Sequence, residues 1–253
     1  MVLFKKRKRT MYGSTLMFIG SSMTQRAFEL ENLGFGIDLA NWYTRFIDII
    51  IRGHSGYNSR WTLLGLKEMI GQYKPTIVCI FLGNNDSSNG GQYVPLDEYK
   101  SNIQAIIEYI KGVNPDVTLI LITPTRSDIP QRTDERSKEY ADVIRQIGNE
   151  TPNSAVLDTW IDQYSITVDD LCDGLHLNAS GNKKISEGIK NVIRTNFPQF
   201  IPYNDSSHSL FDDNNSNGLY NLPTWDELSN TSLEESISIF KKYSEKNNCD
   251  NQI

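Results

Sequence analysis

The chain has 253 residues and a mass of 28.8 kDa, with a formal net charge of −6 and a pI near 5.2. Hydrophobic residues make up 38% of the sequence, enough to build a buried core, so the composition excludes a wholly disordered protein. Five cations lie together at 5–9, which leaves an acidic remainder and argues against nucleic acid or an anionic membrane as the main partner.

Residues 1–13 are predicted to form a basic, flexible N-terminal tail. The apolar run that follows, Leu16–Ile19, is too short for a signal peptide. No stretch approaches the ~18 to 20 apolar residues that cross a bilayer, so no transmembrane segment is expected. Three cysteines without metal-like spacing are typical of a cytosolic protein. The sequence therefore predicts a soluble, cytoplasmic protein.

Apolar runs and helical patterns alternate along the chain. Strands are predicted at 16–19, 46–51, 76–82, 117–122 and 155–157, and helices at 38–46, 61–73, 97–111, 134–147 and 180–193. Several of the strand runs are continuously apolar, as expected where both faces of a parallel sheet are buried. The alternation predicts an α/β fold, namely a three-layer α/β/α sandwich on a five-stranded parallel, flavodoxin-like sheet.

The character of the sequence changes after about residue 200. Asn, Asp and Ser crowd residues 204–218, which is typical of a linker. A helical pattern follows at 232–243. We therefore predict a catalytic domain at 14–200, and a polar linker with a C-terminal extension that contains a short helix at 201–253.

Chemically useful residues follow the predicted strands. They are Ser22, Gly56, Asn85, and the pair Asp173 and His176 in the loop before the last helix. They supply a hydroxyl, a backbone amide, a side-chain amide, a carboxylate and an imidazole, which acyl transfer by a serine nucleophile requires. Because ligands bind at the carboxyl ends of strands in open α/β sheets, one cleft could collect them.

Each residue also has a simpler interpretation. A serine, glycine or asparagine after a strand is common turn chemistry, and Ser21 and Gly53 compete with their neighbours by adjacency. A zinc site at His176 is disfavoured, because no set of His, Cys and carboxylate residues is suitably spaced around it. A thiol enzyme built on Cys172 and His176 is also disfavoured, because residues four positions apart in a loop seldom meet. Only the order of Ser22, Gly56, Asn85 and the Asp173–His176 pair, taken together, favours a serine esterase.

At this point the chain resembles the SGNH superfamily of GDSL-like esterases and lipases. Within it, the isoamyl acetate-hydrolysing esterase group is most similar. The resemblance covers roughly residues 14 to 197 and also includes the tail segment 222–225. It rests on the segments Arg52–Trp61, Phe81–Ser87, Tyr93–Tyr99, Leu121–Pro124 and Asp173–Asn182.

The resemblance implies a role for each candidate residue. Ser22 would be the nucleophile, and His176, oriented by Asp173, would be the general base and then the acid. The oxyanion hole would consist of the N–H groups of Ser22 and Gly56 and the side-chain amide of Asn85. No metal or organic cofactor is implied.

The resemblance also implies a substrate, a small-molecule carboxylic ester with a short acyl group such as acetate, hydrolysed through an acyl-enzyme. A thioesterase, lysophospholipase or carbohydrate deacetylase would use the same residues. One position departs from the family, which usually has Asp where this chain has Ser21. A non-catalytic binding protein that has lost activity through this change is a third reading.

Overall fold

The computed structural model describes residues 13–202, 205, 225–229 and 231–249. Residues 14–201 form one compact unit, and the described C-terminal residues belong to a second. The two units are described separately. The predicted basic tail up to residue 12, the predicted linker except Asp205, and residues 222–224 lie outside the described residues.

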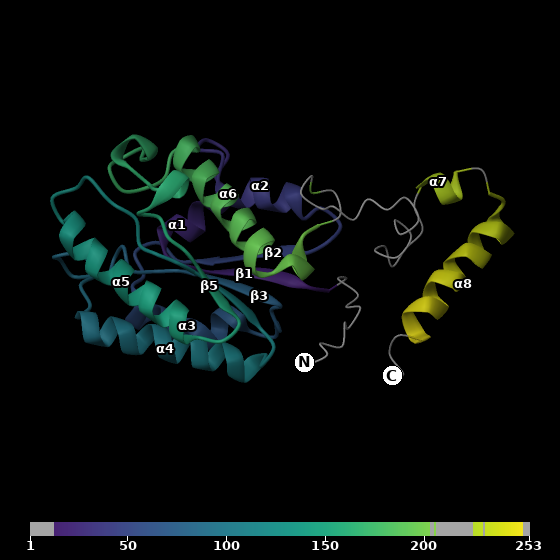
Figure 1. Ribbon diagram of the computed structural model, residues 1–253, viewed down its shortest axis with the longest axis horizontal. Helices are drawn as coiled ribbons and strands as arrows, with labels where there is room; N and C mark the ends of the chain where they lie inside the picture. The colour runs from purple at the N-terminus through teal and green to yellow at the C-terminus, as the bar shows by residue number, and fades with distance from the viewer. Residues whose placement is uncertain (1–12, 203–204, 206–224, 230, 250–253) are drawn as a thin grey trace. The chain divides into compact units, whose positions relative to one another are not determined.

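A parallel sheet of five strands forms the centre of the larger unit (Figure 1). Its strands are β1 (Thr15–Gly20), β2 (Asp48–Gly53), β3 (Ile77–Phe81), β4 (Thr118–Ile122) and β5 (Ser154–Leu157), in the order β2-β1-β3-β4-β5. Each of the five predicted strands is present. The predicted α/β fold class is confirmed, and the strand order reverses between β1 and β3, where open α/β sheets bind their ligands.

Helices cover both faces of this sheet (Figure 1). One face packs against α2 (Phe35–Trp42) and α6 (Ala179–Asn196), and the other packs against α3 (Ser59–Ile70), α4 (Leu96–Val113) and α5 (Asp134–Glu150). Short helical turns complete the unit at α1 (Ser22–Gln25), η1 (Arg26–Phe28), η2 (Asp162–Tyr164), η3 (Val168–Asp170) and η4 (Pro198–Phe200).

The core explains why the strand sequences are continuously apolar. Alternate residues of the central strands pack in one buried cluster with α3, α4 and α5, among them Met17, Val78 and Leu119. On the opposite face, the rings of Phe18 and Phe35 lie 5.2 Å apart. Burial of each such side chain contributes about 1.5–3 kcal/mol to folding. A strand between two helical layers therefore needs apolar residues at every position.

Helix α2 lies several residues earlier than predicted, at 35–42 instead of 38–46. Its first turn is capped from a distance, because the side chain of Asn182 accepts a hydrogen bond from the Phe35 N–H over 3.2 Å. The chain then turns after Tyr43, whose carbonyl accepts from the Phe46 N–H, and Arg45 adopts a φ of +66°. Periodicity alone cannot reveal a cap that comes from another helix.

The smaller unit contains two described helices, α7 (Trp225–Leu228) and α8 (Leu233–Cys249). Ser232 starts α8 with a reciprocal cap: its hydroxyl accepts from the Glu235 N–H at 3.3 Å, and the Glu235 carboxylate accepts from the Ser232 N–H at 2.8 Å. The helix predicted at 232–243 is therefore present and continues to residue 249. Within the described part of the chain, no helix combines the length and apolar character needed to cross a membrane.

Candidate active site

Ser22 lies two residues after the end of β1, at the first position of α1. Its side chain is largely buried, with 7% of the residue exposed. The preceding turn is tight, since a Cβ at Gly20 would lie 2.2 Å from Thr24 Oγ1 and 2.6 Å from the Phe81 carbonyl oxygen. Glycine is therefore required there. The N–H groups of a first helical turn lack intrahelical partners, so no hydrogen bond within α1 engages the Ser22 N–H.

Asp173 and His176 lie in a short loop between η3 and α6. Leu171 and Leu177 form an antiparallel bridge at the base of this loop. Within it, one oxygen of the Asp173 carboxylate accepts from the backbone N–H of Leu175 at 3.0 Å and of His176 at 2.7 Å. The backbone of the loop thus fixes the direction of both functional side chains.

These side chains form a continuous hydrogen-bonded chain with the serine. Asp173 Oδ2 lies 2.6 Å from His176 Nδ1, and His176 Nε2 lies 2.9 Å from Ser22 Oγ. The carboxylate can only accept, so it places the imidazole proton on Nδ1 and leaves Nε2 free to take the hydroxyl proton. We call Ser22, His176 and Asp173 the triad. Its geometry is that of a serine activated by an oriented base.

The ionised form of the Asp173 carboxyl group is strongly favoured. Partial burial opposes ionisation, but hydrogen bonds from the His176 backbone and ring and from the Leu175 N–H outweigh it and lower the pKa of Asp173 to about 2. The carboxylate is therefore negative throughout the range in which esterases are assayed. It can stabilise the imidazolium that forms when His176 takes a proton.

Gly56 and Asn85 follow β2 and β3, the two strands that flank β1. The Asn85 side-chain amide donates to the Tyr57 carbonyl over 2.7 Å, which joins the two loops. Gly56 has a φ of +84°, a conformation that suits glycine. No acceptor among the described residues receives its N–H. Its rival Gly53 is instead the last residue of β2, in register with Gly20.

The two adjacent serines differ in their surroundings. Ser22 hydrogen-bonds to the imidazole, whereas Ser21 is the N-cap residue of α1 and its side chain forms no capping hydrogen bond. The Ser21 carbonyl accepts from the Gln25 N–H at 2.9 Å. The backbone of this turn is therefore held without the aspartate that the family usually has at this position.

His176 and Cys172 have separate side-chain partners. Both ring nitrogens of His176 are engaged by Ser22 and Asp173, while the Cys172 thiol lies 4.0 Å from Arg26 Nη1. No group of three or more His, Cys, Asp or Glu residues that could hold a metal ion occurs in the described part of the chain. His54 stacks on Tyr57, with 5.0 Å between ring centroids. His208 lies outside the described residues.

Two further residues, which the sequence pattern does not indicate, support this site. Arg132 donates from Nη2 to Asn85 Oδ1 at 2.8 Å and from Nε to the Asn84 carbonyl at 2.5 Å. Gln92 donates from Nε2 to the Gly56 carbonyl at 2.8 Å. Arg132 is one of 25 Lys and Arg residues, in a polar stretch before α5. Nothing local distinguishes it from a solvated arginine.

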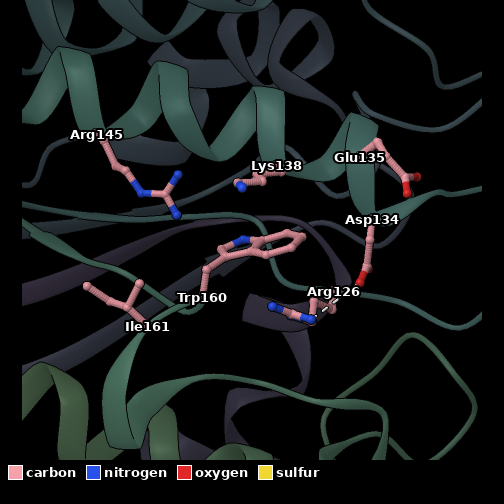
Figure 2. Close-up of a pocket in the computed structure, with 7 residues that line it drawn as sticks. All are labelled: Arg126, Asp134, Glu135, Lys138, Arg145, Trp160 and Ile161. Atoms are coloured by element: carbon pink, nitrogen blue, oxygen red, sulfur yellow. Dashed lines mark hydrogen bonds and ion pairs between the residues drawn. The ribbon is translucent and has the colours of Figure 1, made fainter.

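A separate pocket of about 480 Å³ lies beside α5 (Figure 2). Trp160 lies across it, with the Arg126 guanidinium carbon 4.7 Å from the ring centroid. Arg126 also pairs with Asp134 at 3.5 Å, and Lys138 and Arg145 extend from α5 on the other side of the ring. No triad member lines this pocket, so it is distinct from the hydrogen-bonded site.

Comparison with known proteins decides the family. A model of the GDSL-like lipase/acylhydrolase family matches residues 18–184, a range that includes the whole triad. The chain belongs to this family. As a GDSL-type acylhydrolase, it is a carboxylic-ester hydrolase.

Several relatives share most of the length of this GDSL-type hydrolase. The human isoamyl acetate-hydrolyzing esterase 1 homolog is 34% identical, covering 74% of this chain and 86% of its own. The isoamyl acetate-hydrolyzing esterase of Saccharomyces cerevisiae is 32% identical, and the match covers 76% of this chain and 91% of that protein. An Arabidopsis thaliana GDSL esterase/lipase is also 32% identical, and the match covers 71% of this chain and 85% of that protein. The resemblance to the isoamyl acetate-hydrolysing group is confirmed.

Solved structures share the fold at lower identity. The acetylxylan esterase Axe2 of Geobacillus stearothermophilus matches with a TM-score of 0.60 at 24% identity, over 72% of this chain and 94% of that one. A lipase/acylhydrolase from Enterococcus faecalis matches with a TM-score of 0.60 at 23% identity, over 72% and 95%. These likenesses support the three-layer fold.

Next to the Asn85 loop, this hydrolase buries a carboxylate. Asp86 is fully buried; one of its oxygens accepts from the Ser59 N–H at 2.8 Å, and the other has no hydrogen-bond partner among the described residues. Burial raises the pKa of Asp86 to about 6, although hydrogen bonds from Ser59 oppose the shift. The folded state therefore holds this proton more tightly than the unfolded chain does.

The stability of Asp86→Asn relative to the wild type should consequently depend on pH. The folded-state pKa lies above the unfolded value of 3.8. The contribution of Asp86 to the stability of the wild type is therefore greatest below its unfolded pKa. This contribution is lost as pH rises through about 6. The full loss is about 3 kcal/mol. Asparagine does not ionise, so the advantage of the variant should grow by up to that amount between pH 4 and pH 7.

Urea unfolding at several pH values measures this difference. The exposed residue Asp48, changed to asparagine, controls for the loss of one negative charge elsewhere. An advantage of Asp86→Asn that stays constant from pH 4 to pH 7 would contradict the interpretation.

Proposed function

We propose that this chain hydrolyses short-chain carboxylic esters of the acetate type through an acyl-enzyme on Ser22. The observation that carries the proposal is the chain of hydrogen bonds from Asp173 through His176 to Ser22, at 2.6 and 2.9 Å. The acetate preference is supported by relatives that are named isoamyl acetate-hydrolyzing esterases.

In the first half-reaction, Ser22 Oγ attacks the ester carbonyl carbon while His176 Nε2 takes the hydroxyl proton. The carbonyl oxygen becomes an oxyanion, which accepts from the N–H groups of Ser22 and Gly56 and from the amide of Asn85. The intermediate then collapses. The bond to the alcohol oxygen breaks, His176 returns its proton to that oxygen, and the acyl group remains on Ser22.

In the second half-reaction, water attacks the acyl carbon while His176 takes one of its protons. Collapse of the second tetrahedral intermediate breaks the bond to Ser22 Oγ and releases the carboxylic acid. The proton on His176 returns to the serine. Throughout both halves, Asp173 keeps the imidazole in place and stabilises its charged form.

Labelling by an organophosphate and the dependence of rate on acyl length test the proposed serine mechanism and the short-acyl preference. Diethyl p-nitrophenyl phosphate should modify one serine per chain, and mass spectrometry of the peptides should place the label on Ser22. Rates on p-nitrophenyl esters should fall from acetate through butyrate to octanoate. Label on another serine, or none, would count against the serine mechanism. An octanoate rate equal to that for acetate would instead overturn the short-acyl preference.

A second panel separates the alternative substrates. The same residues would serve a thioester, a lysophospholipid or an acetylated carbohydrate, because leaving-group contacts set the choice. Initial rates on one member of each class, relative to an alkyl acetate, rank them directly. Binding of esters without turnover would support the non-catalytic reading. We further propose a cytosolic location, since Cys79 and Cys172 are both free thiols.

A further inference from the structure

Behind the proposed oxyanion hole lies a buried cation, the guanidinium of Arg132. The residue is 8% exposed, and burial lowers its pKa. Among the described residues, no carboxylate forms an ion pair with it. Its acceptors among the described residues are neutral oxygens of Asn84, Asn85 and Gln92. Burying a charge is costly, and buried arginines are ordinarily paired, so an unpaired one marks a position with another purpose.

The contacts of Arg132 determine which way the Asn85 amide points. Arginine can only donate, and its Nη2 lies 2.8 Å from Asn85 Oδ1. The amide cannot flip, because a flip would turn its NH₂ group against the guanidinium. One N–H of that NH₂ group donates to the Tyr57 carbonyl over 2.7 Å. The second N–H is left for the oxyanion.

Arg132 is also connected to the Gly56 loop, through the side chain of Gln92. Arg132 Nη2 lies 3.4 Å from Gln92 Oε1, and Gln92 Nε2 donates to the Gly56 carbonyl at 2.8 Å. The main chain of Gln92 is held in turn, because Asn58 Nδ2 donates to its carbonyl at 2.9 Å. One guanidinium therefore connects both proposed oxyanion donors that lie outside the serine turn.

We propose that Arg132 is a positioning residue for ester hydrolysis, which orients and polarises the Asn85 amide toward the oxyanion. This inference rests on the proposed function. The positive charge draws electron density from the amide through Oδ1, so the free N–H becomes a stronger donor.

A double-mutant cycle tests the proposal, with kcat measured on p-nitrophenyl acetate. Arg132→Gln should lower kcat by on the order of 10²-fold, near the loss expected for one oxyanion donor, with little change in KM. In an Asn85→Ala background, the same change should have almost no further effect, because the amide that it positions is gone. A purely structural arginine would lower kcat by the same factor in both backgrounds.

Two further variants keep the result interpretable. Arg136→Gln removes the same charge four residues later, from a side chain that donates to Ser88 and stacks on Tyr93, and should leave kcat near that of the wild type. Arg132→Lys retains the charge but cannot reach both Asn84 and Asn85 as a fork, so an intermediate loss is expected. If Arg132→Gln fails to fold, the cycle is completed with Arg132→Lys.

The outcomes separate this inference from the proposed function. A fall in kcat for Asn85→Ala, combined with an Arg132 effect that vanishes in that background, supports both. A fall for Asn85→Ala with an unchanged Arg132 factor in the two backgrounds overturns only the role of Arg132. An unchanged kcat for Asn85→Ala overturns the proposed oxyanion hole itself, and with it the positioning role.

Discussion

Replacing Ser22 with alanine should lower kcat on p-nitrophenyl acetate by on the order of 10⁶-fold, as loss of the serine does in other triads. Without Oγ no acyl-enzyme can form, and His176 has no hydroxyl proton to accept. The remaining rate would come from the oxyanion donors and from binding, which act on a direct attack by water. Initial rates at saturating ester, with the melting temperature of each protein, measure the effect.

Ser21→Ala is the matched control for this variant. It deletes a hydroxyl from the neighbouring buried serine, whose side chain forms no capping hydrogen bond. The control should retain most of the wild-type activity. A large loss in Ser21→Ala combined with normal rates in Ser22→Ala would transfer the nucleophile role to Ser21. Equal rates in the wild type and Ser22→Ala would exclude Ser22 as the nucleophile.

Asp173→Asn should lower kcat by about 10⁴-fold while leaving the loop intact. The amide oxygen can still accept from the N–H groups of Leu175 and His176, which now lie 3.0 and 2.7 Å from the carboxylate. The amide nitrogen, however, would donate to His176 Nδ1 and favour the tautomer that presents Nε2–H to the serine. That tautomer cannot take the hydroxyl proton.

Asp169→Asn provides the comparison, because it makes the same chemical change at an exposed residue four positions earlier. Its kcat should stay close to that of the wild type. Labelling of both variants with an organophosphate adds a second measure: Asp173→Asn should react slowly at Ser22, and Asp169→Asn at the normal rate. A kcat for Asp173→Asn within tenfold of the wild type would contradict the orienting role.

Local sequence chemistry predicted the sheet well. A strand covered on both faces must be apolar at each position, so the runs around Met17, Val78 and Leu119 indicated strands without tertiary information. The limits of α2 were predicted less well. Its start depends on the side chain of Asn182, which lies 147 positions away from Phe35. No window of sequence around the helix contains that signal.

The candidate site shows the same division. Ser22, Asp173 and His176 were singled out because acyl transfer needs a hydroxyl, a carboxylate and an imidazole after strands, and the structure brings the three together. Arg132 was not singled out, since a loop arginine usually reaches solvent and its burial depends on how the loop folds back. Its proposed function depends on acceptors that lie more than 40 positions away in the chain.

The separation of Ser22 from His176 has a consequence for how activity arises. The two residues are 154 positions apart, and all five strands are complete by Leu157, before the imidazole appears in the chain. A nascent or refolding molecule can therefore possess its whole sheet and still lack a base. Contacts of such long sequence separation form slowly. Recovery of ester hydrolysis after denaturation thus reports the docking of the last loop, whereas circular dichroism reports the earlier assembly of the sheet.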